Sequence, residues 1–370
     1  MHQTFTRLHH DFLIVGQGLS GSLLAWSLTQ KNKSVLIISD NKPSASHIAA
    51  GLINPVTGKR LVKSEKTRQF LETGEILYSD LETFFGKKYL HPTPMLRVLM
   101  SADGRSAWEK RIKDPDYKNY IGQINENAQT ENIRTPFGSF EQQQTGWLDI
   151  PALLSSLQNY FKEKNIFICE QLDNKAINFE PDYVTYKTQH ARHTARHIIF
   201  CEGYHAQYNP LFSWLPFKPA KGNILTYQSH SILPDKIINA GQWILPVSDT
   251  VFRTGATYQW DELNEHPNAD AKQTLENGLE QIFIHPSKYD LIKHKAGVRP
   301  CTADTQPFLG THPENSQVSI FNGFGSRGSL TIPYYTNLFV RWKLNNQPLP
   351  ENIDIKRHQK KYLSHLNLAP

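Results

Sequence analysis

The stretch Asp11-Phe12-Leu13-Ile14-Val15-Gly16-Gln17-Gly18-Leu19-Ser20-Gly21 decides the fold, because a short apolar run leads directly into the pattern Gly-x-Gly-x-x-Gly. An apolar run of this length is typical of a buried parallel strand. The leucine-rich stretch from Leu19 to Gln30 has no breaker and predicts a helix, and Val35 to Ile38 predicts a second strand. This is a strand–helix–strand unit of about 30 residues, whose crossover should be right-handed.

Each glycine of this turn has a physical task. Gly16 permits the tight turn after the strand, Gly18 lets the backbone approach a pyrophosphate, and Gly21 allows close packing of helix and strand. The helix that begins at Leu19 and Ser20 directs its N-terminus toward the phosphate charge. A purely structural glycine turn is the alternative, but the strand, the helix and the second strand are all present. The sequence therefore predicts a dinucleotide-binding fold.

Two further segments after the first unit are candidate contacts. Asp40 follows the second strand, where an acidic residue binds ribose hydroxyls in such folds; a solvated acid in a turn is the alternative. The stretch from Ser46 to Gly51 is small and apolar, so a flat ring could lie against its backbone. An ordinary junction between a loop and a helix has the same composition.

The composition limits the class of protein. A chain of 370 residues with 39% hydrophobic and 20% charged residues indicates an ordinary globular protein of two domains. No stretch approaches the roughly 18 apolar residues of a spanning helix, and no signal peptide is recognisable. Three widely spaced cysteines argue against a disulfide framework, so we expect a cytoplasmic protein. The net charge of +6 is dispersed along the chain, which leaves nucleic-acid binding an alternative that is not favoured.

The order of the remaining patterns indicates two interleaved domains. Apolar residues at helical spacing predict helices around Leu153 to Phe161 and around Leu275 to Phe283. We expect an α/β fold in which a Rossmann-type, glutathione-reductase-like domain is joined to an α+β domain built on an antiparallel sheet. The expected nucleotide-binding domain comprises residues 1–62, 150–215 and 290–370, and the expected substrate domain comprises residues 63–149 and 216–289.

Four separated segments resemble one known family. They are the loop from Gly16 to Gly21, the turn from Ser46 to Gly51, the strand end Ile198-Ile199-Phe200-Cys201-Glu202-Gly203, and a C-terminal group formed by Gly297-Val298-Arg299-Pro300, Thr302, Asp304, Pro307 and Asn322 to Gly328. In this order they resemble the D-amino-acid oxidase superfamily of FAD enzymes, which includes glycine oxidase and sarcosine oxidase. The cofactor that this resemblance implies is FAD.

The resemblance also implies a reaction and a set of site residues. In the family, hydride passes to the flavin from a carbon that bears a neutral amine, and the imine hydrolyses; oxygen or a quinone then accepts the electrons. Arg299 matches an arginine that pairs with the substrate carboxylate, and Arg327 lies in the flavin loop as a second candidate catalytic residue. The implied cofactor contacts are Gly16, Gly18, Leu19, Ser20, Gly21, Asp40, Ser46, Ala49, Ala50, Gly51, Cys201, Gly203, Gly323, Gly325, Ser326, Arg327, Gly328 and Ser329.

The sequence departs from the family in ways that shape the expectations. Sarcosine oxidase-like members attach flavin through a cysteine at the position of Gly297, so we expect non-covalent FAD. The segments Gly325 to Gly328 and Gly255 to Tyr258 resemble the oxidase half of a bifunctional enzyme that makes 5-methylaminomethyl-2-thiouridine in tRNA. A modified tRNA nucleoside is therefore the alternative substrate, and a flavin-binding protein without turnover is the third hypothesis.

Two basic features receive separate interpretations. His190, His193 and His197 alternate with arginines, which favours an exposed hairpin over a metal site, and we expect no metal. Lys221 follows a Pro-Ala pair and could place an amine near the flavin.

Overall fold

The computed structural model describes residues 7–40, 42–127, 129–130, 132–188, 191–284 and 288–366. The chain forms two compact units, each made of separated segments. Unit 1 consists of Met1–His47, Pro151–Pro219 and Arg299–Pro370, and unit 2 consists of Ile48–Ile150 and Ala220–Val298. Residues 48–62 and 290–298, which the sequence patterns assigned to the nucleotide-binding domain, are part of unit 2. The reason is strand pairing: β3 (Leu52–Ile53) and nearly all of β19 (Tyr289–Arg299) belong to sheets of unit 2.

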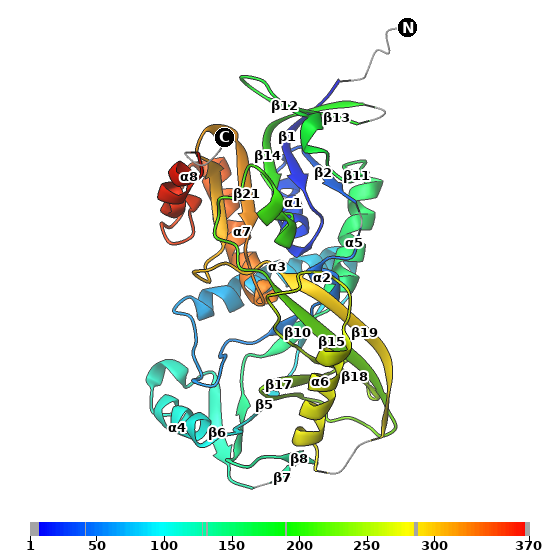
Figure 1. The fold of residues 1–370 in the computed structure, drawn as a ribbon, viewed down its shortest axis with the longest axis vertical. Coiled ribbons are helices and arrows are strands. Elements are labelled where there is room, and N and C mark those ends of the chain that lie inside the picture. Colours follow the sequence, from blue (N-terminus) through cyan, green and yellow to red (C-terminus); the bar gives the residue numbers. More distant parts are fainter. Residues whose placement is uncertain are drawn as a thin grey trace. The chain divides into compact units, whose positions relative to one another are not determined.

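Unit 1 is a mixed, mainly parallel sheet with helices (Figure 1). The strand order is β11-β2-β1-β14-β13-β12, with β21 beside β14 and β20 beside β21. Its elements are β1 (Arg7–Val15), α1 (Leu19–Thr29), β2 (Val35–Ser39), α2 (Ala45–Ile48), α5 (Ile150–Glu163), β11 (Phe167–Cys169), β12 (Ile177–Phe179), β13 (Val184–Lys187), β14 (Arg192–Phe200), β20 (Phe308–His312), β21 (Asn315–Asn322), α7 (Gly328–Asn345) and α8 (Gln359–Leu366), where α2 and α5 each extend one residue into unit 2.

The sheet of unit 1 is buried on both faces, which explains its continuous apolar strands. On one face, alternate residues of β1, β2 and β14 pack against the segment from Ala206 to Leu215, together with Ile355 and Tyr362. Helix α1 lies against β1, β2, β21 and α7. The predicted strand–helix–strand unit is confirmed, and β1 pairs in parallel with both β2 and β14. Helix α5 buries the four predicted residues Leu153, Leu154, Leu157 and Phe161.

Unit 2 contains an eight-stranded sheet in the order β19-β15-β18-β17-β16-β5-β9-β6. From β15 to β6 the neighbouring strands are antiparallel except for β16 with β5, which is parallel. The remaining elements, with bounds, are α3 (Thr67–Phe85), β4 (Leu90–Pro92), β5 (Met95–Val98), α4 (Ala102–Arg111), β6 (Ile121–Asn125), β7 (Gln129–Thr130), β8 (Ile133–Arg134), β9 (Ser139–Gln142), β10 (Gly146–Leu148), β15 (Ala220–Ser229), β16 (Ile237–Ala240), β17 (Gln242–Pro246), β18 (Val251–Gly255) and α6 (Ala269–Ile282).

Helix α6 covers one face of this sheet. Its residues Leu275, Leu279 and Ile282 are buried and join a core with Leu96, Leu225, Ile238, Ile244 and Phe252. The helix begins at the N-cap Asn268, whose side chain accepts a hydrogen bond from the Ala271 amide at 2.8 Å. The predicted inner face of this helix is confirmed. Among the described residues, no helix combines the length and the apolar character that crossing a membrane requires.

The histidine-rich hairpin is formed by β13 and β14, but it is not exposed as predicted. His193 is only 7% exposed, because β14 pairs with β13 on one side and with β1 on the other. The rings of His193 and His10 stack with centroids 5.7 Å apart, and burial lowers the pKa of both. His190 lies outside the described residues.

Candidate functional site

The glycine turn between β1 and α1 is sterically closed to any other residue at two positions. Gly16 has φ +99°, and a Cβ there would lie 2.6 Å from the Cys201 carbonyl oxygen. A Cβ on Gly21 would lie 2.0 Å from the Gly16 oxygen. The turn also joins both strands, since the Gly16 amide donates to Ile38 O at 2.8 Å and the Cys201 amide donates to Val15 O at 2.8 Å. The predicted residues Gly16, Gly21 and Cys201 are therefore in mutual contact.

The first turn of α1 offers backbone donors. Gly18 is the N-cap and supplies no side-chain cap, so the amides that begin the helix are left for other partners. The Ser46 hydroxyl accepts a hydrogen bond from the Leu19 amide at 3.1 Å, and a Cβ on Gly18 would meet that hydroxyl at 3.3 Å. The structure thus brings Ser46 to the glycine turn, while its expected contact with the cofactor stays a prediction. An N-terminus of this kind suits a phosphate.

A buried glutamine that the motif did not reveal holds the turn in place. Gln17 donates from Nε2 to the Ser22 hydroxyl at 3.2 Å and to Leu154 O at 3.3 Å. Its Oε1 accepts from Gln158 Nε2 at 3.0 Å. The turn is therefore tied both to α1 and to α5. A polar residue between two motif glycines was the available signal for this role.

The end of β14 lies beside the glycine turn and carries a titratable group. Glu202 follows Cys201, and its Cα would be 3.5 Å from a Cβ on Gly16. Burial raises the pKa of Glu202 to about 7, although a hydrogen bond from Asn209 Nδ2 at 2.8 Å favours the ionised form. Burial also raises the pKa of the Cys201 thiol, which makes it inert. Sequence reasoning named Cys201 and Gly203 but missed Glu202.

The glycine loop before α7 is fastened to the same edge of the sheet. Asn322 donates from Nδ2 to the Gly203 carbonyl oxygen at 2.9 Å. The Gly325 amide donates to Pro300 O at 3.2 Å, and a Cβ on Gly325 would be 3.5 Å from Cys301 Sγ. The loop, the end of β14 and the segment after Arg299 are thereby held together within unit 1.

The two predicted arginines differ in their surroundings. Arg327 precedes α7 and is half-buried; its Nε and Nη2 atoms are buried and have no hydrogen-bond partner among the described residues. Burial lowers the pKa of this guanidinium. Arg299 is half-buried at the end of β19, and its carbonyl oxygen accepts from the Cys301 amide at 2.8 Å. Arg327 therefore holds two buried nitrogen atoms that no described residue satisfies with a hydrogen bond.

The remaining predicted cofactor contacts, Asp40 and the segment from Ala49 to Gly51, lie in different units and have different surroundings. Asp40 ends β2 in a half-buried position, where its carboxylate pairs with Lys42 Nζ at 3.2 Å. Ala49, Ala50 and Gly51 belong to unit 2. Arg253 of β18 donates to the carbonyl oxygens of Ile48 and Ala49, and a Cβ on Gly51 would lie 1.9 Å from Leu148 O. The half-buried guanidinium of Arg253, which the sequence patterns did not identify, thus fixes this turn within unit 2.

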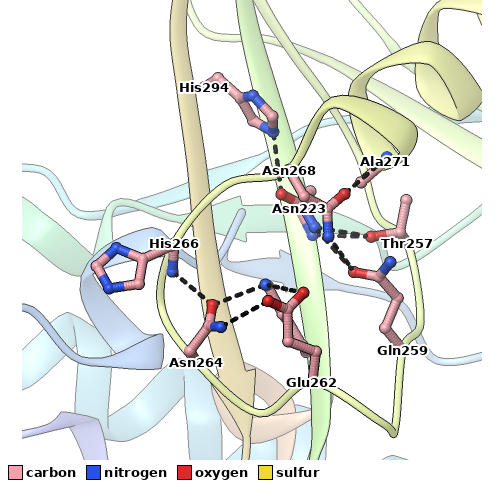
Figure 2. A network of polar contacts seen from close by, with 10 residues as sticks. Asn223, Thr257, Gln259, Glu262, Asn264, His266, Asn268, Ala271 and His294 are labelled. Atoms are coloured by element: carbon pink, nitrogen blue, oxygen red, sulfur yellow. Dashed lines mark hydrogen bonds and ion pairs between the residues drawn. The ribbon is translucent and has the colours of Figure 1, made fainter.

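Figure 2 shows a polar network in unit 2 that ties the start of β15 to the segment after β18. The buried Lys221 donates from Nζ to Asn264 Oδ1 at 2.8 Å and lies 3.2 Å from Glu262 Oε2. Asn223 Oδ1 contacts His294 Nε2 at 3.0 Å. The ammonium of Lys221 is therefore directed at this segment and anchors it to the sheet. The described residues contain no group of three His, Cys, Asp or Glu side chains suited to a metal ion.

Comparison with known proteins agrees with this geometry. The family model for FAD dependent oxidoreductases, DAO, matches residues 11–342. Glycine oxidase from Pseudomonas putida is 23% identical over 136 residues, which are 36% of this chain and 37% of that protein. The tRNA 5-methylaminomethyl-2-thiouridine biosynthesis bifunctional protein MnmC from Marinobacter nauticus is 20% identical over 367 residues, which are 93% of this chain and 57% of that protein. Both matches thus span less than two thirds of the relative's length.

Solved structures show the same fold at low identity. The glycine oxidase from Geobacillus kaustophilus superposes with a TM-score of 0.80 at 18% identity, covering 95% of this chain and 98% of that chain. The iminodiacetate oxidase from Chelativorans sp. BNC1 superposes with a TM-score of 0.78 at 17% identity, covering 93% and 98%. The predicted fold class is confirmed.

Proposed function

The chain belongs to the DAO family of FAD-dependent oxidoreductases, the D-amino-acid oxidase superfamily, and from this premise we propose that it oxidises a C–N bond of a small amino acid or secondary amine. The cofactor is FAD, and the residues of unit 1 fit it on their own geometry. Gly16 and Gly21 leave no room for a Cβ, and Arg327 has two buried nitrogen atoms to which no described residue offers a hydrogen-bond acceptor. Glycine-lined turns and orphaned donors are features that a pyrophosphate and the polar edge of a flavin would satisfy.

The contacts with FAD follow from these positions as part of the proposal. The Ser20 amide would bind the pyrophosphate beside Leu19, whose own amide donates to Ser46 in the structure. Asp40 would bind the ribose, and Arg327 with the loop from Gly323 to Ser329 would bind the pyrimidine edge of the flavin. FAD supplies the acceptor for the hydride that leaves the substrate carbon. Binding is non-covalent in this proposal: Gly297 has no thiol, and burial raises the pKa of Cys301, which makes it a poor nucleophile.

The chain's own residues bind and orient the amine. Arg299 would hold the substrate carboxylate, because a planar guanidinium matches a carboxylate with two parallel hydrogen bonds. A neutral amine already carries the electron pair that drives hydride departure, so no dedicated base is assigned. The observation that supports the oxidase role best is the family match over residues 11–342 combined with the cofactor-shaped cradle of unit 1.

An anaerobic absorbance experiment tests this proposal. The FAD-loaded protein is mixed with amino acids and N-alkyl glycines, and bleaching of the flavin peaks identifies the substrate class. Arg299→Gln should raise the KM for a carboxylate substrate far more than it changes kcat, whereas Arg299→Lys should retain part of the affinity. Flavin that no amine reduces would refute the oxidase proposal. Reoxidation with oxygen and then with a soluble quinone distinguishes the two electron acceptors, and release of FAD on acid precipitation tests non-covalent binding.

A modified tRNA nucleoside is the second candidate substrate. The observation that favours it is the similarity to MnmC proteins along 93% of this chain. A tRNA substrate predicts binding that weakens steeply with salt, because each phosphate contact releases a counterion. Gel-shift titrations of the FAD-loaded protein with tRNA at about 50 and 200 mM salt measure this dependence. Absence of binding at both salt concentrations would exclude this candidate.

A further inference from the structure

One arginine near the C-terminus of unit 1, Arg357, binds a carboxylate in the segment that follows β19. Arg357 belongs to the short 3₁₀ helix Ile355–His358, which leads directly into α8. Its Nε atom donates to Asp304 Oδ2 at 2.9 Å, and its Nη2 atom donates to Asp304 Oδ1 at 3.4 Å. A planar guanidinium matches both oxygens of a carboxylate in this way. The arginine side chain is only 14% exposed, so this pair differs from a solvated surface ion pair.

The same guanidinium also binds the backbone of the turn that begins at Asp304. Its Nη2 atom donates to the carbonyl oxygens of Gln306 at 3.3 Å and Pro307 at 3.1 Å. Burial alone would raise the pKa of Asp304, but hydrogen bonds from Arg357 and from the Gln306 amide hold this pKa below its ordinary value. The carboxylate therefore stays ionised near neutral pH, and one side chain fixes three points of the turn from Asp304 to Pro307.

This turn is packed directly against the glycine loop before α7. Thr302 is buried, and its Oγ1 donates to Gln306 O at 2.8 Å, the same oxygen that Arg357 binds. A Cβ built on Gly323 would lie 2.8 Å from Thr302 Cγ2 and 3.1 Å from the Phe308 amide nitrogen. The glycine backbone thus touches residues on both sides of the turn, so a shift of the turn would displace the loop.

Thr305, within this turn, has a backbone conformation that a side chain with a branched Cβ disfavours. Its φ is +62°, and such a conformation persists only where the surroundings impose it. Backbone hydrogen bonds supply part of the restraint: the Thr305 amide donates to Thr302 O at 3.3 Å, and the Ala303 amide donates to Pro216 O at 3.0 Å. The bonds from Arg357 restrain the end of the turn. Without them we expect the turn to relax and the glycine loop to lose a fixed support.

We propose that Arg357 is a positioning residue for the cofactor. Acting through Asp304 and the turn, it holds the loop from Gly323 to Gly325 in the conformation that receives the flavin. This inference rests on the proposed contact of that loop with FAD. A loop that is already fixed loses less conformational freedom when its ligand binds, so affinity depends on restraints outside the site.

Titration of the full-length variants with FAD measures the effect on affinity. Arg357→Met removes the charge and all the donors, and it should raise the Kd for FAD about tenfold or more, the range for a charge-assisted hydrogen bond. Arg357→Lys keeps the charge but cannot bind the carboxylate and both carbonyl oxygens together, so it should recover part of the affinity. Asp304→Asn combined with Arg357→Met should bind FAD no more weakly than Arg357→Met alone, because the two residues act as one unit.

Visible circular dichroism of the FAD-saturated protein separates positioning from simple anchoring of the C-terminal segment. A displaced loop should change the flavin bands of Arg357→Met even at saturation. The anchoring control is Tyr362→Leu, which removes a buried ring of α8 that packs on Trp214 and His312. It should lower the melting temperature but keep the affinity and the flavin bands. Arg341→Met removes an exposed arginine of α7 and should change none of these quantities.

Wild-type affinity and wild-type flavin bands in Arg357→Met would overturn the proposal. Wild-type bands at saturation together with a melting temperature lowered as in Tyr362→Leu would also overturn it, because that is the result for a simple anchor. If Arg357→Met does not fold, Arg357→Lys and Asp304→Asn provide the same comparison. Amines that fail to bleach the flavin while Arg357→Met still weakens FAD binding would refute the proposed oxidation and not the positioning.

Discussion

Replacing Glu202 by Gln should stabilise the protein at pH 8 and leave it almost unchanged near pH 4.5. The folded-state pKa of Glu202 is about 7, against an ordinary value of 4.5, so the folded chain holds this proton more tightly than the unfolded chain does. The stabilisation is present below pH 4.5 and is lost as the pH rises toward 7. Glutamine is uncharged at every pH, and its side-chain oxygen can still accept from Asn209.

The size of the effect follows from the two pKa values. When the folded and unfolded pKa values of a group differ by one, the free energy of unfolding changes by about 1.4 kcal/mol. For Glu202, pKa values of about 7 and 4.5 therefore predict that Glu202→Gln is more stable by about 3 kcal/mol at pH 8. This is about 4 °C in melting temperature if all 370 residues unfold together.

Thermal melting of the FAD-free wild type and Glu202→Gln at intervals from pH 4.5 to pH 8 measures this difference in stability. The control Glu163→Gln removes an exposed carboxylate of α5 and should melt like wild type throughout. A difference between Glu202→Gln and wild type that does not change with pH, or a variant that melts lower at pH 8, would refute the burial argument.

Three further substitutions test how unit 1 holds its cofactor. Gly21→Ala should abolish FAD retention, read as the ratio of flavin to protein absorbance, because the added Cβ would sit 2.0 Å from a carbonyl oxygen; Gly104→Ala, whose Cβ would make only ordinary contacts, should retain FAD. Arg327→Met should raise the melting temperature of the FAD-free protein but weaken FAD binding at least tenfold in a fluorescence titration, and the opposite pair of results would contradict its assignment as an orphaned cation. Asn322→Ala should cost about 1–3 kcal/mol of stability by leaving the Gly203 carbonyl oxygen unpaired, and unchanged urea denaturation would show that this bond is unimportant.

The sequence predicted correctly those helices and strands whose formation depends on residues close together in the chain. The run before Gly16 and the stretch from Leu19 formed the expected strand and helix, because apolar period and glycine spacing are encoded in neighbouring residues. The histidine hairpin was misjudged, because His193 is buried by pairing with β1, a strand far away in the sequence. The arginines of this segment, Arg192 and Arg196, are indeed exposed, and the burial of His193 between them becomes visible only when the partner strand is known.

The candidate site also divides into residues that local sequence patterns predicted and residues whose surroundings depend on distant strands. Glycines whose role is steric, such as Gly16 and Gly21, were readable from their spacing. The burial of Glu202, and of Arg97 in β5 of unit 2, was not predicted, because nothing in the neighbouring sequence indicates that these ionisable side chains are buried. That property arises only when distant strands close around the side chain, as β16 and β9 do on either side of Arg97.

Because strands distant in the sequence are neighbours in the sheet of unit 1, the sheet cannot be completed until late in synthesis. Leu8 of β1 pairs with His193 of β14, and β21, which begins at Asn315, completes the centre of the same sheet. At a ribosomal rate of about 5–20 residues per second, β1 waits about 10 to 40 seconds for its first central neighbour. During that time β1 can pair with β2, but its other edge is unpaired and open to association with other chains. Slower elongation lengthens this exposure, so yield in cells should depend on chaperone supply more than the stability of the finished protein suggests.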